Sequence, residues 1–168
     1  MIDVLDLANP AALSAADFQF RSGTSTDVGA WAAAPAPFAI TVREKAGVNG
    51  ADRIAIRWLN NNRNGVAEPN EAVAKAYLEV KLLANANTGL PADDTFYFAN
   101  LVGDSGAGNS AAIAIVNATD ELGARNETPG LKPITNVHDY DRNRVVTAND
   151  QLLARNNAGS LLFLTVPS

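Results

Sequence analysis

Oxygen-bearing side chains recur at a fixed spacing between residues 139 and 150. They stand at positions 1, 3, 5, 9 and 12 of a twelve-residue stretch, and the backbone carbonyl of position 7 completes the pattern of a loop that wraps around Ca²⁺. Ca²⁺ takes six to eight hard oxygen ligands, and no donor here is soft enough to favour zinc or copper. The stretch therefore predicts an EF-hand-like calcium loop, here called loop two, with the candidate ligands Asp139, Asp141, Asn143, Val145, Thr147 and Asp150.

Loop two departs from an ordinary EF-hand at two positions. Position 12 is Asp150 instead of the longer Glu, and position 6, where the sharp turn favours Gly, is Arg144. A left-handed backbone at Arg144 would cost about 1–2 kcal/mol. The alternative reading of the stretch is a polar Asp/Asn turn that binds no metal.

The end of loop two and the segment after it occur twice in the chain. Residues 116–126 and 146–156 are identical at seven of eleven positions, at an offset of 30, which indicates an internal duplication. Each copy reads as the end of a polar loop that runs into a short helix. We expect the two helices to face each other through Leu122 and Leu152, in a module that needs bound metal for stability.

The loop before the first copy, loop one, fits the calcium spacing less well. Counting back eleven residues from Asp120 reaches Asn109, but Ala111 and Ile113 then fall where ligands belong. A start at Asp104 instead leaves about five extra residues before Asp120. If this insertion loops out, an ion could be bound by Asp104, Asn109, Asn117 and Asp120.

Residues 60–71 form a third candidate loop, just after a predicted strand. This loop has the turn glycine that loop two lacks, but Asn at position 1 removes a carboxylate and should lower the affinity. The alternative is a solvated Asn/Gly turn. Its candidate ligands are Asn60, Asn62, Asn64, Val66, Glu68 and Glu71.

The first hundred residues read as strands. Apolar and polar residues alternate in several short runs, and irregular polar connections separate these runs, which is typical of a β-sandwich. Residues 76–83 also fit a helical face, but alternation favours a strand there. We therefore predict a mixed fold, with a β-sandwich domain at 1–102 and a small α-helical module at 103–168; the strands are expected near 18–21, 38–42, 54–58, 76–83 and 96–102.

Composition excludes several classes of function. The 168 residues are 47% hydrophobic with a net charge of −5, so a globular core is expected and a phosphate track for nucleic acid is not. The chain has no cysteine, no run of about 20 apolar residues and no signal peptide at its start, so it is either cytoplasmic or a piece of a longer secreted chain. His138 is the only histidine and no nucleophile motif accompanies it, so we expect no enzyme.

Asp-x-Asp-x-Asn at 139–143 with Asp at position 12, followed by a Leu-bearing helix and present beside a second loop-helix copy, resembles a dockerin, a calcium-binding module that presents paired loop-helix units to a cohesin receptor. Runs such as Phe18-Gln19-Phe20-Arg21 and Phe96-Tyr97-Phe98 are similar to the C-terminal region of very large secreted bacterial proteins, in which a β-domain precedes a dockerin-like pair. The resemblance covers nearly the whole chain, although its β part carries no function that can be named.

This resemblance implies a secreted or cell-surface protein that binds Ca²⁺ and a cohesin-like partner. In dockerins the partner is read by loop positions 10 and 11 and by helix positions 17 and 18. Those positions are nearly alike in the two copies, which would permit a two-fold related, dual mode of binding. They are occupied here by Ala118, Thr119, Arg125, Asn126, Ala148, Asn149, Arg155 and Asn156.

Other readings stay open at this stage. Arg125 and Arg155 could merely cap their helices through the helix dipole. The β-domain could bind carbohydrate or a polysaccharide surface with calcium as a structural staple, which an exposed Trp31, Trp58 or Tyr97 on a flat face would favour. A purely structural module at the end of a giant adhesin is the third reading.

Overall fold

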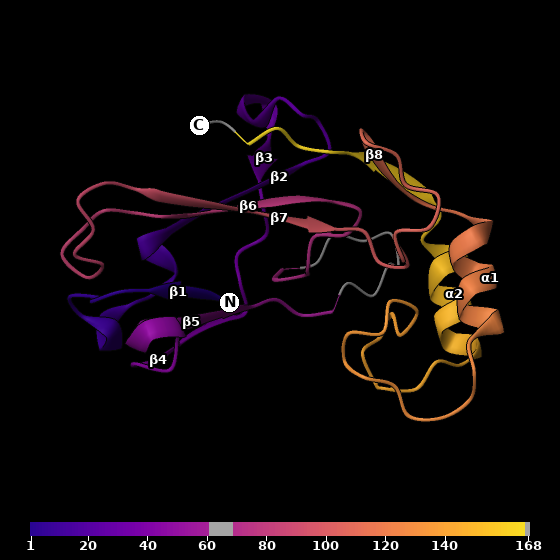
Figure 1. Cartoon of the computed structure of the whole chain (residues 1–168). Helices are drawn as coiled ribbons and strands as arrows, with labels where there is room; N and C mark the ends of the chain where they lie inside the picture. Colours follow the sequence, from indigo (N-terminus) through magenta and orange to yellow (C-terminus); the bar gives the residue numbers. More distant parts are fainter. Residues whose placement is uncertain (61–68, 167–168) are drawn as a thin grey trace. The chain divides into compact units, whose positions relative to one another are not determined.

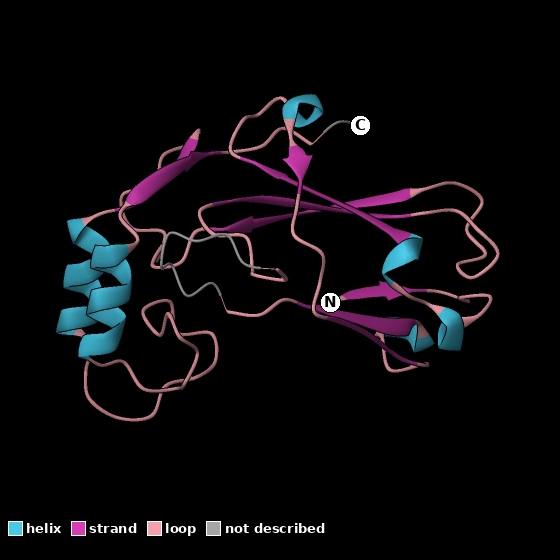
Figure 2. Ribbon diagram, turned by 180° about the vertical axis from the view of Figure 1, so that it is seen from behind, coloured by secondary structure: helices cyan, strands magenta, loops and turns pink. Residues whose placement is uncertain are grey.

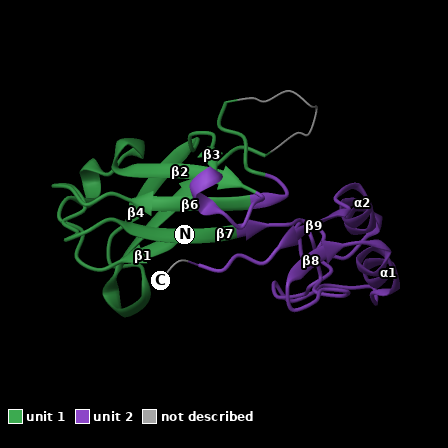
Figure 3. Cartoon of the chain, turned by 90° about the horizontal axis from the view of Figure 1, so that it is seen from above, with its two compact units in different colours: residues 1–23, 31–73, 77–98 green, residues 24–30, 74–76, 99–168 purple. Residues whose placement is uncertain are grey.

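The computed structural model describes residues 1–60 and 69–166, and it divides into two compact units (Figure 3). Unit 1 comprises residues 1–23, 31–73 and 77–98, and unit 2 comprises residues 24–30, 74–76 and 99–168. Unit 2 thus holds the whole segment predicted as the helical module, together with three short stretches that precede it in the sequence. No helix among the described residues has the length and apolar character needed to cross a membrane.

Unit 1 contains two β-sheets. The first has the antiparallel order β1-β5-β4, with β1 at Ile2–Val4, β5 at Asp52–Arg57 and β4 at Ala39–Arg43. The second has the order β3-β2-β6-β7. Its strands are β3 (Ala32–Ala33), β2 (Phe18–Gly23), β6 (Ala76–Leu82) and β7 (Asp94–Asn100) (Figure 1).

Both sheets of unit 1 contribute to a single core. Ile54 of the first sheet and Leu82 of the second are completely buried, and the cluster around them draws on both sheets. The core residues are Ile2, Val4, Leu7, Phe18, Ile54, Val80 and Leu82. Two sheets that share one apolar interior are the arrangement expected of a sandwich.

The second face of β6 is also covered, which explains why the strand is buried on both sides. Glu79 is 1% exposed and accepts hydrogen bonds from Nε and NH2 of Arg21, its direct cross-strand neighbour, both at 2.7 Å. Tyr77 stacks on Trp31, and Tyr97 meets Trp31 edge-on. The hydrogen bonds from Arg21 lower the pKa of Glu79 despite its burial, so this residue can stay ionised in the interior.

Unit 2 is built on two short helices and a two-stranded sheet (Figure 2). The helices α1 (Ala118–Asn126) and α2 (Ala148–Asn156) pack side by side, and β8 (Ile113–Val116) pairs antiparallel with β9 (Gly159–Leu162). The other regular elements of the described residues are single turns of 3₁₀ helix. One lies in unit 2 and three lie in unit 1: Val28–Ala30, and Pro10–Ala12, Ala15–Asp17 and Val48–Gly50. The chain is therefore β-rich with a small helical part.

The predicted contact between the helices through their leucines is wrong. Leu122 and Leu152 are 52% and 46% exposed, whereas Ala124 and Ala154 are buried at 4% and 0%. Each helix therefore buries its alanine, and its leucine lies on an exposed side. Close packing extends to Gly103, because a Cβ atom there would lie 2.8 Å from Cα of Ala154.

Candidate metal centre

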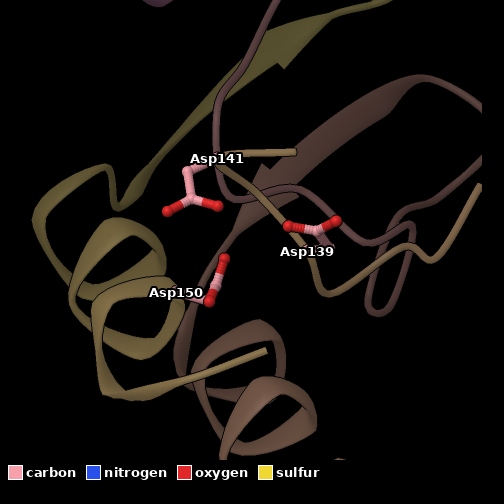
Figure 4. Close-up of side chains that lie close together, drawn as sticks. All are labelled: Asp139, Asp141 and Asp150. Atoms are coloured by element: carbon pink, nitrogen blue, oxygen red, sulfur yellow. The ribbon is translucent and has the colours of Figure 1, made fainter. Parts of the chain in front are cut away.

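Loop two brings three carboxylates together. One carboxylate oxygen from each of Asp139, Asp141 and Asp150 lies within 4.8 Å of the other two (Figure 4). Asp139 and Asp150 are completely buried, and Asp141 is exposed. Positions 1, 3 and 12 of the predicted loop therefore converge as a calcium loop requires.

Backbone N–H groups hold the two buried carboxylates in place. Asp139 accepts from the N–H groups of Asn143 at 3.1 Å and Arg144 at 2.9 Å. Asp150 accepts from the N–H groups of Tyr140 and Thr147, each at 2.8 Å. These donors fix both side chains in orientation.

The donors around Asp139 and Asp150 are neutral, and none of the three clustered carboxylates is ion-paired with Lys, Arg or His in the described parts of the chain. Buried charges are costly unless they are paired or coordinate a metal. The donor set therefore fits a hard divalent cation.

The backbone of loop two turns sharply where the sequence lacks glycine. Arg144 has φ 73°, in the left-handed region expected for position 6, and Arg142 has φ 59°. Each conformation costs about 1–2 kcal/mol for a residue with a side chain. The side chains offset part of this cost, because Arg142 NH1 donates to the carbonyl of Asn136 at 2.7 Å and Arg144 Nε donates to that of Lys132 at 3.3 Å.

The other predicted ligands of loop two, Asn143, Val145 and Thr147, form hydrogen bonds or a β-bridge. Asn143 Oδ1 accepts from the N–H of Val145 at 2.8 Å, and Asn143 Nδ2 donates to Asp141 at 2.8 Å. Thr147 is the N-cap of α2, and its hydroxyl accepts from the N–H of Asn149 at 3.2 Å. Val145 forms an isolated antiparallel bridge with Leu131.

Loop one is arranged like loop two around its last residue. The N–H of Ser105 donates to Asp120 Oδ1 at 2.9 Å, as the N–H of Tyr140 does to Asp150 Oδ1. The N-cap N–H donates to the other oxygen in both copies, from Asn117 in loop one and from Thr147 in loop two. Asp104 and Asp139, the residues before these position-2 donors, are therefore equivalent, and loop one is five residues longer than loop two.

Loop one differs in what satisfies its carboxylates. The hydroxyl of Ser105 donates to Asp120 at 2.7 Å, and Asn109 Nδ2 donates to both oxygens of Asp104, at 3.2 and 3.1 Å. Asn109 Oδ1 accepts from the N–H of Ile115 in β8. Side-chain donors therefore satisfy the loop-one carboxylates, so the loop-one calcium site stays a prediction with weaker support than loop two.

The third candidate loop falls largely outside the described residues. Asn62, Asn64, Val66 and Glu68 lie there, and only Asn60 and Glu71 of its candidate ligands are described. Asn60 is exposed, whereas Glu71 is 7% exposed and forms a parallel bridge with Leu59. Calcium binding by this loop stays a prediction.

All eight residues predicted to meet a partner are exposed. The two arginines among them differ in surroundings, because Arg155 forms a two-pronged ion pair with Glu121 of α1. Residue 151, the counterpart of Glu121 in α2, is a neutral Gln, so the duplication does not generate the same pair for Arg125. The two helix faces are therefore alike in shape and unequal in charge pairing.

His138 lies beside loop two, with a side chain that is 23% exposed. Its Nδ1 lies 2.8 Å from Glu127, which also accepts from Lys132 Nζ at 2.9 Å and Asn136 Nδ2 at 3.4 Å. Hydrogen bonds from these three partners, that from His138 first, lower the pKa of Glu127 to about 2. Gly123 leaves room for the imidazole, since a Cβ there would lie 2.6 Å from Nε2 of His138. This cluster ties the end of α1 to the entrance of loop two.

Tyr140 and Ser105 were not singled out from the sequence. Alignment of Asp104 with Asp139 places both at position 2 of their loops, which is the signal that could have identified them. Burial above all, with the charges of Asp120, Asp104 and Asp150, raises the pKa of the Tyr140 hydroxyl to about 12, against a lowering by Ser105. The hydroxyl therefore lies close to carboxylates of both loops.

Trp31, Trp58 and Tyr97, the three rings considered for carbohydrate contact, are buried or half-buried. Trp31 is 6% exposed, and Trp58 and Tyr97 are half-buried. The indole N–H of Trp58 donates to the carbonyl of Pro35 at 2.8 Å, and its ring meets Phe20 edge-on. These three rings do not supply the flat exposed platform that would favour carbohydrate binding.

Comparison with known proteins gave no match to a family model, to a curated protein or to a solved structure.

Proposed function

We propose that the chain is a non-catalytic calcium-binding module whose paired loop-helix units dock onto a cohesin-like protein. The carrying observation is the convergence of Asp139, Asp141 and Asp150, two of them buried and none ion-paired with a cationic side chain in the described residues. A bound Ca²⁺ would neutralise these charges, and Asn143, Val145 and Thr147 would complete its coordination. The duplicated geometry of the two loops supports the dockerin-like part of this proposal.

Isothermal titration with CaCl₂ tests the metal site. We expect one site of high occupancy in the full chain and its loss in the double variant Asp139→Asn/Asp150→Asn. Asp93→Asn/Asp94→Asn is the matched control, because it removes the same number of charges from exposed positions of unit 1. Equal calcium binding by all three proteins would refute the site.

The docking part of the proposal rests on the exposed faces of α1 and α2. Ala118 and Ala148 are exposed at the first helical position of each unit, and Leu122 and Leu152 add apolar surface on the same helices. A receptor that contacts both helices would bury this apolar surface. Burial of apolar surface stabilises a complex by about 25 cal/mol per Å². The predicted partner residues are therefore available for contact.

A blocking variant tests docking separately from calcium binding. Ala118→Arg/Ala148→Arg places a long charged side chain on each helix face without touching a candidate ligand. We expect this variant to bind Ca²⁺ as before and to lose the calcium-dependent capture of a receptor from a secreted fraction. Capture that survives both the blocking variant and chelation would refute the docking function while leaving the metal site intact.

We further propose that the module acts outside the cell or at its surface, as part of a longer chain. Asp at position 12 and the strained turn should give a weaker site than an intracellular EF-hand buffer has. Extracellular modules bind Ca²⁺ with Kd of about 10⁻⁴–10⁻³ M, which suits the calcium concentration outside cells. A Kd below about 10⁻⁷ M would argue against this placement.

A further inference from the structure

Tyr140 is bonded to both halves of the duplicated module. Its backbone N–H donates to Asp150 Oδ1 at 2.8 Å, so it holds the twelfth-position carboxylate of loop two. Its hydroxyl donates to the backbone carbonyl of Asp120 at 3.2 Å, in the first turn of α1. One residue therefore touches the last ligand position of loop two and its counterpart in loop one.

The contact on the loop-one side continues through Ser105. The N–H and the hydroxyl of this residue both donate to the carboxylate of Asp120. Asp120 in turn accepts from the N–H of Asn117, the N-cap of α1. A hydrogen-bonded path thus runs from Asp150 through Tyr140 to Asp120 at the start of α1, where Ser105 holds the Asp120 carboxylate.

The carboxylates at the two ends of this path, Asp150 and Asp120, differ in their partners. In loop two, Asp150 lies among two other carboxylates and has no cationic partner side chain within residues 1–60 and 69–166. In loop one, the Ser105 hydroxyl already satisfies Asp120, and an amide of Asn109 satisfies Asp104. Side chains of loop one therefore satisfy its carboxylates, whereas a cation would neutralise those of loop two.

We propose that Tyr140 is a positioning residue that couples the loops, so that Ca²⁺ bound at loop two also orders loop one and the start of α1. This inference rests on the proposed calcium function. Ca²⁺ would fix Asp150 and with it the N–H of Tyr140, and the fixed ring would then hold its hydroxyl on Asp120. Because coupling between sites is reciprocal, the same contact strengthens calcium binding.

Amide NMR spectra of the full chain during a CaCl₂ titration test the coupling. We expect Asn143–Thr147 and Ser105–Thr119 to shift with the same apparent Kd in the natural protein. Tyr140→Phe keeps the ring and the backbone donor and removes only the hydroxyl. In this variant we expect loop two to respond still, with about fivefold weaker affinity, and the loop-one signals to stop following calcium.

Two further variants provide a control and an independent test. Tyr77→Phe removes a tyrosine hydroxyl from unit 1 and should leave the calcium response of both loops unchanged. Ser105→Ala breaks the path on the loop-one side without altering Tyr140, so it should reduce the loop-one response even if Tyr140→Phe fails to fold.

The outcomes separate the two proposals. Loop-one signals that follow calcium fully in Tyr140→Phe or Ser105→Ala, or that stay still in the natural protein while loop two shifts, overturn the coupling and leave the calcium function standing. No shift in either loop of the natural protein overturns the calcium function, and the coupling with it.

Discussion

At the scale of single residues, the proposed calcium site would make the stability of loop two depend on a cation. Asp141 contributes one of three clustered carboxylates and is the exposed member of the cluster. Without a cation the three groups repel one another, whereas with Ca²⁺ all three are stabilising. A single substitution should therefore have opposite effects in the two conditions.

Asp141→Asn is expected to stabilise unit 2 in EGTA, by up to about 1 kcal/mol because the side chain is exposed. In saturating Ca²⁺ the same variant should be less stable than the natural protein, since it loses an anionic ligand and binds calcium about tenfold less tightly. Urea unfolding followed by amide signals of unit 2 measures both effects. The same sign in both conditions would contradict the charge argument, and Asp94→Asn in unit 1 controls for a general charge effect.

Glu127 gives a pH-dependent prediction. Its hydrogen bonds hold its folded pKa near 2, against an ordinary value of 4.5, so the unfolded chain takes up the proton first as the pH falls. The stability that these contacts supply is complete above pH 4.5 and declines between pH 4.5 and about 2.

Replacement of Glu127 by Gln removes this titration. We expect Glu127→Gln to be less stable than the natural protein at pH 7 in EGTA, and the difference in Tm to shrink as the pH is lowered toward 2.5. Other acidic groups titrate in both proteins and cancel in the comparison. A difference in Tm that is constant from pH 7 to 2.5 would show that the contacts of Glu127 with His138, Lys132 and Asn136 do not hold its carboxyl ionised.

At the scale of elements, a buried alanine marks the packed side of each helix of unit 2. Ala154 is completely buried in the pair, and Leu152, two residues earlier, is 46% exposed. We expect Ala154→Leu to destabilise unit 2 by about 1–3 kcal/mol through overpacking, and Leu152→Gln to change its stability by less than about 0.5 kcal/mol. Chemical unfolding measures the free energy of unfolding of both variants. A larger loss in Leu152→Gln than in Ala154→Leu would support the predicted contact between the leucines instead.

Sequence patterns predicted elements whose signals are local. The alternation at 76–83 correctly indicated a strand, β6, because one face lies in the core while Tyr77 and Glu79 are covered from the other side. The duplicated segments correctly indicated two helices. Their capping boxes depend on residues within the repeat itself, Asn117 with Asp120 and Thr147 with Asp150.

Features that depend on distant partners escaped the sequence reasoning. The pairing of β8 with β9 joins residues 113–116 to 159–162, and no local pattern indicates that register. The outward direction of Leu122 and Leu152 follows from the close packing at Ala124 and Ala154, which only tertiary contact reveals. The hydroxyl of Ser105 on Asp120 likewise needs the loop geometry, because serine at position 2 has no general meaning.

At the scale of the whole molecule, the two units should respond differently to chelation. Unit 1 has its own apolar core, whereas unit 2 contains three clustered carboxylates and two nine-residue helices. Metal binding stabilises the state that holds the site, so its removal loosens the unit that contains it.

Hydrogen exchange measured with and without EGTA tests this difference. We expect faster exchange of the α1 and α2 amides in EGTA and unchanged exchange in β2, β5 and β6 (Figure 1). The variant Asp139→Asn/Asp150→Asn in Ca²⁺ should reproduce the pattern of the chelated protein. Uniform acceleration across both units would instead indicate that they unfold as one.

The pairing of β8 with β9 has a mechanical consequence. In its antiparallel register Ile113 faces Leu162 and Val116 faces Gly159, so the chain enters β8 and leaves β9 at the same end of the ribbon. Tension applied beyond Leu162 therefore loads the ladder one residue pair at a time, beginning at Ile113 and Leu162, instead of shearing all pairs together. The ribbon would peel open at low force, and a pull from that side would detach β9 before it strained the hydrogen bonds of loop two.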